Sequence, residues 1–474
     1  MASTTTLYVD LDGSLISTDL LHEALLKLVR VEPFALLNLP AWLMRGKAAF
    51  KREVMSRVRI DVATLPYRAE VLQHLRDARA AGQRIVLATA SDGAVAQEVA
   101  DHLGLFDAVL ASDGERNLSG AGKLAALQED AAGRAFCYLG NDPVDLHVWK
   151  GSASGVVVSR SGSLARRAAA ATQVVAHISP PAVPMRRYLY ALRVHQWLKN
   201  LLIFLPLLPV LHSLDARTVS MAVLAFFAFG LMASAIYVLN DLLDLESDRR
   251  HKRKRLRPFA AGELTAVQGL LMTTLLCLVS LGLSLRFLPR AFVAVLLVYL
   301  VLTTSYSFFL KRRAIVDVFA LATLYTVRVV AGAVATGLPL SLWILTFSLF
   351  IFLSLALAKR YVELNGTPAQ VDQMSRDRNY HRGDIPLVLA GGVAAGQTAA
   401  LILSLYLQDP QILARYSNPL YLWILIPVFL FWIMRIWLKG VRGVLHDDPV
   451  VFAARDWVSR LACVIAAAAF WAAG

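Results

Sequence analysis

Two acidic residues near the start of the chain have the spacing of a phosphate-transfer site. Asp10 and Asp12 stand two positions apart in "LYVDLDGSL", directly after a short apolar run. A turn at the end of a strand can present both carboxylates towards one site, where one attacks phosphorus and the other handles the proton. A cation between them lowers their mutual repulsion. The pair therefore indicates phosphoryl chemistry.

Further polar groups follow other predicted strands. Thr89 in "RIVLATASDG" offers a hydroxyl to a phosphate oxygen, and Lys123 in "GAGKLAAL" offers a compact positive charge. Asp142 and Asp145 follow a fourth apolar run in "YLGNDPVD". Because ligands bind at the carboxyl ends of the strands in an open parallel sheet, we expect these groups at one site. Taken singly, each of them is equally well explained as a turn residue.

A second polar group, Asn240, Asp241, Asp244 and Asp248, follows a long apolar run. On a helix the three aspartates fall at i, i+3 and i+7, along one face. Clustered like charges repel, so a face of three aspartates suggests a bound cation. Mg²⁺ prefers oxygen ligands and often bridges to the phosphates of a substrate. Arg257, the last arginine of the basic run that follows, is expected to contact the same ligand. The alternative interpretation is a solvated helix end.

Other charges lie within or beside apolar segments. Asp317 follows Lys311 and Arg312, and Arg328 falls in the middle of a span. An intramembrane arginine is a functional candidate because burying it is costly. Four more polar residues open the first span or close the sixth: Lys199, Asn200, Lys359 and Arg360. Each cation is also explained by the membrane flank or, for Arg328, by a structural ion pair.

The N-terminal part has the pattern of an α/β domain. Residues 1–160 alternate short apolar runs with charged helical stretches, which predicts a parallel sheet in a Rossmann-like fold. A proline-rich stretch at 179–187 predicts a linker. We therefore expect an α/β domain at 1–178 and an all-α membrane domain at 188–474.

The C-terminal part is too apolar for a soluble domain. The chain is 57% hydrophobic and 17% charged. Nine segments are long enough to span or nearly span a bilayer: 196–214, 218–239, 265–285, 291–310, 315–335, 341–358, 386–406, 418–437 and 457–473. The loops on one side carry 18 Lys and Arg and those on the other carry 4. This asymmetry, with no signal peptide at the start, predicts a cytoplasmic N-terminal domain.

Charge and cysteine content exclude some functions. The net charge of +14 comes from basic residues gathered in short loops between spans, which favours membrane topology over nucleic-acid binding. Cys137, Cys277 and Cys463 are scattered, so neither a disulfide framework nor a zinc site is indicated.

Residues 5–165 resemble the haloacid dehalogenase (HAD) superfamily. The resemblance implies that Asp10 is the nucleophile and Asp12 the general acid and base, and that Thr89 and Lys123 hold the phosphate. It also implies Mg²⁺ on Asp10, the Asp12 carbonyl and Asp145, and a helical cap at about 17–78. The family's last motif usually places an acid directly after the glycine, where this chain has Asn141. The alternative is therefore an inactive scaffolding domain.

Residues 187–474 resemble the UbiA-type intramembrane prenyltransferases. The motif from Asn240 to Asp248, followed by Arg257-Pro258, carries the resemblance and implies a phosphorylated donor bound through Mg²⁺. The family's second acidic site normally has two acids four residues apart, but here Leu321 follows Asp317. The single acid and the many cations resemble the branch typified by decaprenyl-phosphate phosphoribosyltransferase, which implies phosphoribosyl diphosphate as donor and polyprenyl phosphate as acceptor.

Together the two resemblances predict a bifunctional Mg²⁺-dependent enzyme of the bacterial inner membrane. The membrane domain would join 5-phosphoribose to a polyprenyl phosphate, and the HAD domain would remove the 5-phosphate. One alternative is prenylation of an aromatic quinone precursor, with the phosphatase serving elsewhere. Another is a membrane carrier or scaffold. Prenyl chain length and oligomeric state are left open.

Overall fold

The computed structural model describes residues 5–113, 116–366, 372, 378–445 and 449–474. The chain forms two compact units: Met1–Leu192 with Val238–Met272, and Arg193–Tyr237 with Thr273–Gly474. The segment that carries the second acidic group therefore belongs to the same unit as the N-terminal part. The predicted limits of the two domains and of the linker stay predictions.

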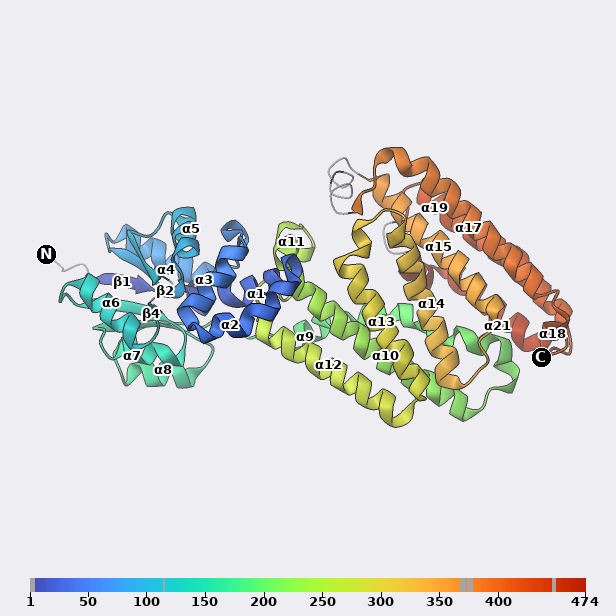
Figure 1. Ribbon diagram of the computed structural model, residues 1–474, viewed down its shortest axis with the longest axis horizontal. Helices are drawn as coiled ribbons and strands as arrows, with labels where there is room; N and C mark the ends of the chain where they lie inside the picture. The colour runs from blue at the N-terminus through green and yellow to red at the C-terminus, as the bar shows by residue number, and fades with distance from the viewer. Residues whose placement is uncertain (1–4, 114–115, 367–371, 373–377, 446–448) are drawn as a thin grey trace. The chain divides into compact units, whose positions relative to one another are not determined.

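A six-stranded parallel sheet forms the centre of the first unit (Figure 1). Its order is β3-β2-β1-β4-β5-β6, and every neighbouring pair is parallel. The strands are β1 (Thr6–Val9), β2 (Ile85–Asp92), β3 (Ala108–Ser112), β4 (Phe136–Gly140), β5 (Ser154–Val158) and β6 (Gln173–Ile178). The predicted parallel α/β fold is confirmed. In this order β1, where Asp10 follows, lies between β2 and β4.

Helices cover both faces of the sheet because alternate strand residues point to opposite sides. Leu7 and Val9 pack in one core with α4 and α5, whereas Tyr8 packs in the other with α6, α7 and α8. These helices are α4 (Ala69–Ala80), α5 (Gly93–Leu103), α6 (Ala121–Ala131), α7 (Leu146–Trp149) and α8 (Gly162–Ala169). Both cores consist of buried apolar side chains, which hold the strands and so fix the positions of their carboxyl ends.

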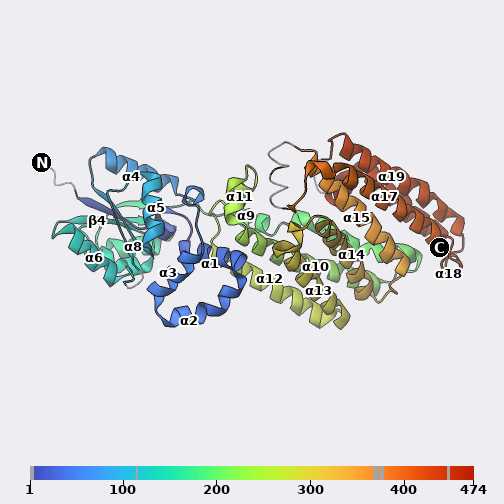
Figure 2. The same cartoon turned by 45° about the horizontal axis from the view of Figure 1, so that its top comes forward.

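A helical insertion stands between β1 and β2, where the cap was predicted (Figure 2). Asp19 begins its first helix by accepting a hydrogen bond from the backbone N–H of His22 at 3.0 Å. A bridge between Ile16 and Tyr67 brings the two ends of the insertion together. Its elements are α1 (Leu20–Val31), η2 (Pro33–Asn38), α2 (Leu39–Met44), α3 (Lys47–Arg57) and η3 (Val62–Thr64).

Eight helical segments of the described residues are long and apolar enough to cross a membrane. They are Val194–Ser213, Ala216–Leu243, Ala266–Phe287, Arg290–Arg312, Val316–Thr336, Leu342–Leu364, Arg382–Tyr406 and Pro419–Val441. The ninth predicted span forms a shorter apolar helix, Trp457–Ala473. The count of nine spans is therefore not confirmed.

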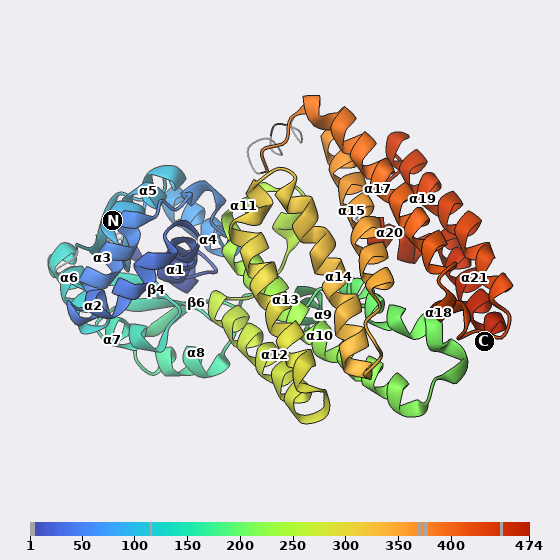
Figure 3. The same cartoon turned by 45° about the vertical axis from the view of Figure 1, so that its right-hand side comes forward.

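The first of these segments is a 3₁₀ helix, η5 (Val194–Ser213), and the others are α-helices, three of which begin or end in a short 3₁₀ turn. The remaining helices are α9 (Met185–Ala191), α10 (Ala216–Leu243), α11 (Leu245–Arg250), η6 (Lys254–Leu256), α12 (Ala266–Phe287), α13 (Arg290–Phe308), η7 (Leu310–Arg312), α14 (Val316–Thr336), α15 (Leu342–Leu364), η8 (Arg382–Asp384), α17 (Ile385–Tyr406), α18 (Pro410–Leu413), η9 (Pro419–Ile424), α19 (Leu425–Val441), α20 (Pro449–Arg455) and α21 (Trp457–Ala473). In Figures 1 and 3, α13, α14, α15 and α17 follow one another side by side.

Close packing holds η5 against α14. A Cβ atom at Gly332 would lie 1.9 Å from the backbone oxygen of Ile203, a contact that only glycine permits. Within the same unit, a Cβ atom at Gly282 on α12 would meet open space. The two glycines therefore differ in packing although both lie inside membrane helices.

We expect Gly332→Ala to lower the thermal unfolding midpoint of the detergent-solubilised protein, because the backbone of η5 must move away from α14. Overpacking of this kind destabilises proteins by about 1–3 kcal/mol. The measurement is the midpoint from intrinsic fluorescence. Gly282→Ala is the matched control and should leave the midpoint unchanged or raise it; equal midpoints for the two variants would contradict the packing argument.

Candidate active sites

The carboxyl ends of three adjacent strands bring together the predicted phosphatase residues. Asp10 follows β1, Thr89 lies on β2, and Asn141 follows β4. Lys123 extends from α6, and its Nζ donates to Asp10 Oδ1 at 2.7 Å. Both side chains of this ion pair are almost completely buried. A buried ion pair of this kind holds the Asp10 carboxylate in a fixed position where a phosphate would enter.

Asp12 is held by two donors. Its Oδ1 accepts from the backbone N–H of Leu20 at 2.8 Å, and its Oδ2 accepts from the Ser91 hydroxyl. Burial raises the pKa of Asp12 to about 7, with the charge of Asp19 adding to the effect. Burial also raises the pKa of Asp10 to about 6, against the opposing effect of Lys123. Asp12 is thus the acid that retains its proton to higher pH, which suits a proton donor.

Asp145 accepts three hydrogen bonds. Its Oδ1 accepts from the Tyr138 hydroxyl at 2.7 Å, and its Oδ2 accepts from the backbone N–H groups of Asn141 and Asp142, both at 2.9 Å. These hydrogen bonds fix the turn after β4. The role of Asp145 as a metal ligand stays a prediction.

The oxygens of Asp10 and Asn141 fit a hard cation. The Ser14 hydroxyl lies 3.1 Å from Asp10 Oδ2 and 2.9 Å from Asn141 Oδ1, so the amide oxygen stands beside the carboxylate. Mg²⁺ accepts neutral oxygen ligands together with one carboxylate. No group of three or more His, Cys, Asp or Glu side chains in the described part of the chain could hold a metal. The amide at Asn141 is therefore compatible with Mg²⁺ but gives it less negative charge.

Three residues of this site were missed in the sequence. Ser91 follows Thr89 by two positions, so the period of two along a strand would have placed both on one side. Tyr138 accepts from Lys123 at 3.0 Å and links it to Asp145. Lys51 of the cap donates to the Ala90 carbonyl at 2.7 Å, and burial lowers its pKa. No local sequence signal indicates where a cap lysine will lie.

The second acidic group divides into two parts. Arg257 Nη1 lies 3.0 Å from Asp241 Oδ1 and 2.5 Å from Asp248 Oδ2, so these two carboxylates converge on one cationic group. Asp244, between the ends of α10 and α11, instead pairs with Arg30 Nη1 at 2.6 Å. Asp241 and Asp248 thus converge as the predicted face of three aspartates requires. Asp244 does not join them, because the helix is interrupted at that residue.

The converging carboxylates fit Mg²⁺. Two oxygens that share one guanidinium nitrogen can share a divalent cation, which prefers carboxylate ligands. Burial raises the pKa of Asp248, against the effect of Arg257. Asn240 lies half-buried near the end of α10. The roles of these residues in metal and diphosphate binding stay predictions.

The membrane unit contains a buried cluster around Asp317. Asp317 Oδ2 lies 2.6 Å from Arg360 Nε, and both side chains are fully buried. Asp317 Oδ1 accepts from the Tyr380 hydroxyl at 2.7 Å, and Arg378 lies 3.7 Å from Oδ2. Arg360 also pairs with Glu363. The sequence had singled out Asp317 and Arg360 separately, and the structure brings them together.

Arg328 lies in a different cluster. Its Nε donates to Asn200 Oδ1 at 2.9 Å and its Nη2 donates to the Tyr299 hydroxyl at 3.2 Å. The guanidinium lies over the rings of Phe229, Tyr299 and Tyr325, and Lys199 Nζ lies 5.8 Å from the Tyr325 ring centre. Within the described residues no carboxylate forms an ion pair with Arg328, and Asn200 Nδ2 is buried without a hydrogen-bond partner. This arrangement is suited to an anion.

The other predicted cations have less defined surroundings. Lys311 and Lys359 are half-buried, and Arg312 is exposed at the end of η7. Their predicted contacts with a substrate stay predictions.

The raised pKa values of Asp10 and Asp12 predict how stability depends on pH. Because both exceed the ordinary value of 3.8, their stabilising contribution is full below pH 4 and is lost as the pH rises through 6 and 7. In metal-free protein, the thermal unfolding midpoint of the N-terminal unit should therefore decrease as the pH is raised from 5 to 8.

The variant Asp12→Asn should show a shallower pH dependence, since the amide does not ionise. Hydrogen exchange of β1 and β4 with a chelator present measures the effect. The matched control is Asp77→Asn on the exposed side of α4, which should keep the full dependence. Identical slopes for Asp12→Asn and the unmodified chain would show that Asp12 titrates normally.

Two family models match separate parts of the chain. The haloacid dehalogenase-like hydrolase model matches residues 8–150, and the UbiA prenyltransferase family model matches residues 202–472. The uncharacterized protein y4nM of Sinorhizobium fredii is 39% identical over 98% of this chain and 90% of its own length. The nodulation protein NoeC of Azorhizobium caulinodans is 35% identical over 60% of this chain and 91% of its own length.

More distant relatives are also similar to the membrane part. The decaprenyl-phosphate phosphoribosyltransferase of Mycobacterium tuberculosis is 36% identical over 39% of this chain, and the match spans 63% of that protein. The structure of a UbiA homolog from Archaeoglobus fulgidus bound to DMAPP and Mg²⁺ covers 60% of this chain and 99% of that chain, with a TM-score of 0.47 and 15% identity. The chain therefore belongs to the UbiA prenyltransferase family of multi-pass membrane proteins and carries a HAD-like domain at its N-terminal end.

Proposed function

We propose that the chain is a bifunctional enzyme that transfers 5-phosphoribose from phosphoribosyl diphosphate to a polyprenyl phosphate and then removes the 5-phosphate. The observation that carries the proposal is the buried Arg328, which has no carboxylate partner among the described residues. A buried guanidinium calls for an anion, and a lipid phosphate supplies one within the membrane. The relatives named decaprenyl-phosphate phosphoribosyltransferase support the same substrates.

The donor would be held by the acidic motif. In this proposal Asp241, Asp244 and Asp248 bind Mg²⁺, which when bound neutralises the donor's diphosphate and makes it a better leaving group. Asn240 and Arg257 complete the donor contacts. Because Arg257 already lies on two of the carboxylates, it is placed to transfer to a phosphate oxygen once a metal takes them.

The acceptor would be held by the intramembrane cations. A lipid phosphate oxygen attacks the anomeric carbon of the ribose, and the bond from that carbon to the diphosphate breaks, so that diphosphate leaves with the electron pair. No protein nucleophile is required, since positioning and charge neutralisation lower the barrier. The proposal assigns acceptor contacts to Arg328, Asn200, Lys199, Lys311, Arg312, Lys359 and Arg360, with Asp317 orienting Arg360.

The HAD-like domain would act on the phosphorylated product. Asp10 attacks phosphorus while Asp12 gives its proton to the 5-oxygen of the ribose, and Thr89 and Lys123 hold the phosphate. Water then hydrolyses the aspartyl-phosphate, with Asp12 as the base. Mg²⁺ held by Asp10 and its neighbours would lower the repulsion between nucleophile and phosphate. Both reactions would take place on the cytoplasmic face of a bacterial inner membrane.

A transfer assay tests the first step. Purified protein with Mg²⁺, labelled phosphoribosyl diphosphate and polyprenyl phosphate should move label into the lipid phase. Asp241→Asn should lower this transfer about 100-fold or more, the scale of losing one preorganised charge-stabilising group. Asp215→Asn, at the start of the same helix, is the control, since an amide oxygen also accepts from Thr218. Label that stays in water while an aromatic acid is prenylated would support the other enzymatic interpretation.

A second assay tests the order of the two steps. Asp10→Asn should let the 5-phosphorylated lipid accumulate without blocking its formation, as measured by mass spectrometry of the extracted lipid. Asp77→Asn should yield the dephosphorylated lipid as before. If Asp10→Asn stopped lipid formation itself, the two sites would not act in sequence. If the unmodified protein bound lipid without Mg²⁺ and showed no turnover, it would instead be a carrier or scaffold.

A further inference from the structure

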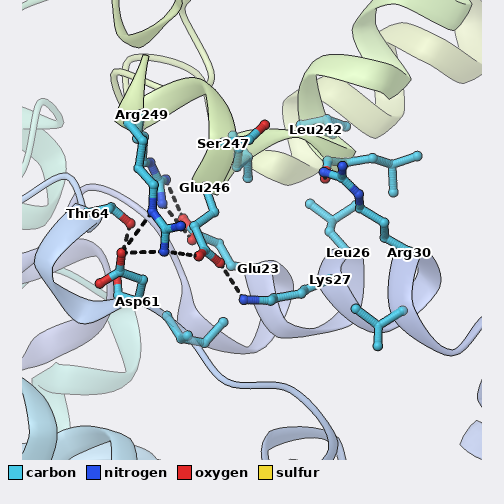
Figure 4. A pocket seen from close by; sticks show the side chains of 15 residues that line it. Glu23, Leu26, Lys27, Arg30, Asp61, Thr64, Leu242, Glu246, Ser247 and Arg249 are labelled. Atoms are coloured by element: carbon cyan, nitrogen blue, oxygen red, sulfur yellow. Dashed lines mark hydrogen bonds and ion pairs between the residues drawn. The ribbon is translucent and has the colours of Figure 1, made fainter. Parts of the chain in front are cut away.

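The cap of the HAD-like domain packs on the segment that carries the donor motif, within the first compact unit. Leu26 of α1 is buried in a cluster with Val238, Leu242 and Leu245. Figure 4 shows Glu23, Lys27 and Arg30 of this cap helix beside Glu246 and Arg249 of α11. The contact therefore joins parts of the chain that are more than 200 residues apart.

Four ion pairs cross this contact, which we name the cap–motif interface. Two acids of the cap meet arginines of the motif segment, Glu23 with Arg249 and Asp61 with Arg250. Two bases of the cap meet acids of the segment: Lys27 pairs with Glu246 and Arg30 pairs with Asp244. Because each side carries charges of both signs, a shifted arrangement would place like charges together.

The pairs differ in strength because they differ in exposure. Glu23 and Arg249 are each only 6% exposed and form two hydrogen bonds, at 2.8 and 2.6 Å. Removing either partner would leave a buried charge unpaired, so this pair holds the interface together. Arg30 and Asp244 are 32% and 30% exposed, and exposed pairs contribute little to stability. The Lys27–Glu246 and Asp61–Arg250 pairs are exposed to a similar or greater degree, but of the three exposed pairs only Arg30–Asp244 holds an aspartate of the motif.

We propose that Arg30 of the HAD-like cap is a positioning residue of the transferase: it holds the Asp244 carboxylate away from the metal, and the Glu23–Arg249 pair keeps it there. The inference rests on the proposed role of Asp244 in metal binding. Asp241 and Asp248 share Arg257 from their own loop, and Asp244 pairs with Arg30 of the cap. Metal binding to all three aspartates thus requires Arg30 to leave Asp244.

Mn²⁺ binding measured by electron paramagnetic resonance tests the proposal without turnover. Every protein compared in this experiment is full-length and carries Asp10→Asn, which weakens the phosphatase metal site. Arg30→Gln should raise the Mn²⁺ affinity about five-fold or more, the lower end of the range for coupled binding equilibria. Lys27→Gln is the matched control, because it removes the same charge from the same helix but its partner, Glu246, lies outside the motif. Equal Mn²⁺ affinities for these two variants would overturn the proposal.

The Glu23–Arg249 pair is tested by exchanging its charges. Glu23→Gln should raise hydrogen exchange in residues 245–256 and increase Mn²⁺ affinity as Arg30→Gln does. The double variant Glu23→Arg with Arg249→Glu should return both measurements towards the starting values. If Glu23→Gln leaves hydrogen exchange unchanged, the cap does not hold the motif segment. Hydrolysis of p-nitrophenyl phosphate by the same variants with Asp10 restored should stay within two-fold, which shows that the HAD-like domain is folded.

These readouts separate the inference from the proposed function. A five-fold change in Mn²⁺ affinity with no transfer from phosphoribosyl diphosphate would sustain the role of Arg30 and refute the substrate. Transfer from phosphoribosyl diphosphate, with equal Mn²⁺ affinities for Arg30→Gln and Lys27→Gln, would sustain the substrate and refute the role of Arg30.

Discussion

The cost of removing a charge from water governs every site in this chain. A buried ion persists only where a partner of opposite charge or several hydrogen bonds compensate its desolvation. Asp10 has Lys123, Glu23 has Arg249 and Asp317 has Arg360, each with both side chains at least nine-tenths buried. Arg328 is compensated by an amide, a phenol and aromatic rings instead. Arg328 thus differs from these three cations, because no carboxylate among the described residues pairs with it.

The same chemistry links the two halves of the molecule. Each proposed site uses carboxylates for a metal and a cation for phosphate, and in each the cation already lies on a carboxylate, Lys123 on Asp10 and Arg257 on Asp241. Such pairs keep the acids from repelling one another before a ligand arrives. In these proposals the binding of an anionic substrate therefore exchanges the partners of existing ion pairs.

Much of the phosphatase site could be predicted because local patterns determine it. Asp10 directly follows a short apolar strand and Thr89 lies near the end of another, and parallel strands place their ends along one edge, so these two could be grouped from order alone. Lys123 lies on the helix α6, and its place in the site was implied by the resemblance to the HAD superfamily. The contacts of Asp244 and Glu23 could not, since their partners are more than 200 positions away and depend on how the cap packs. Similarly, Asp317 and Arg360 were each recognised as unusual, but no spacing rule pairs residues on two different helices. The sequence did not predict the interruption at Asp244, because the acidic residues on either side of it keep the spacing of a continuous helix.

The 3₁₀ helix η5 has a consequence for how the membrane unit is built during synthesis. It contains Pro206 and Pro209, and its backbone is not helical at Val210, so it cannot satisfy all of its own carbonyls as an α-helix does in lipid. The carbonyl of Ile203 is covered by Gly332 of α14. The first membrane segment to leave the ribosome is thus completed by a helix that follows about 130 residues later. In lipid, η5 therefore depends on contact with α14 to cover backbone groups that its own geometry cannot satisfy.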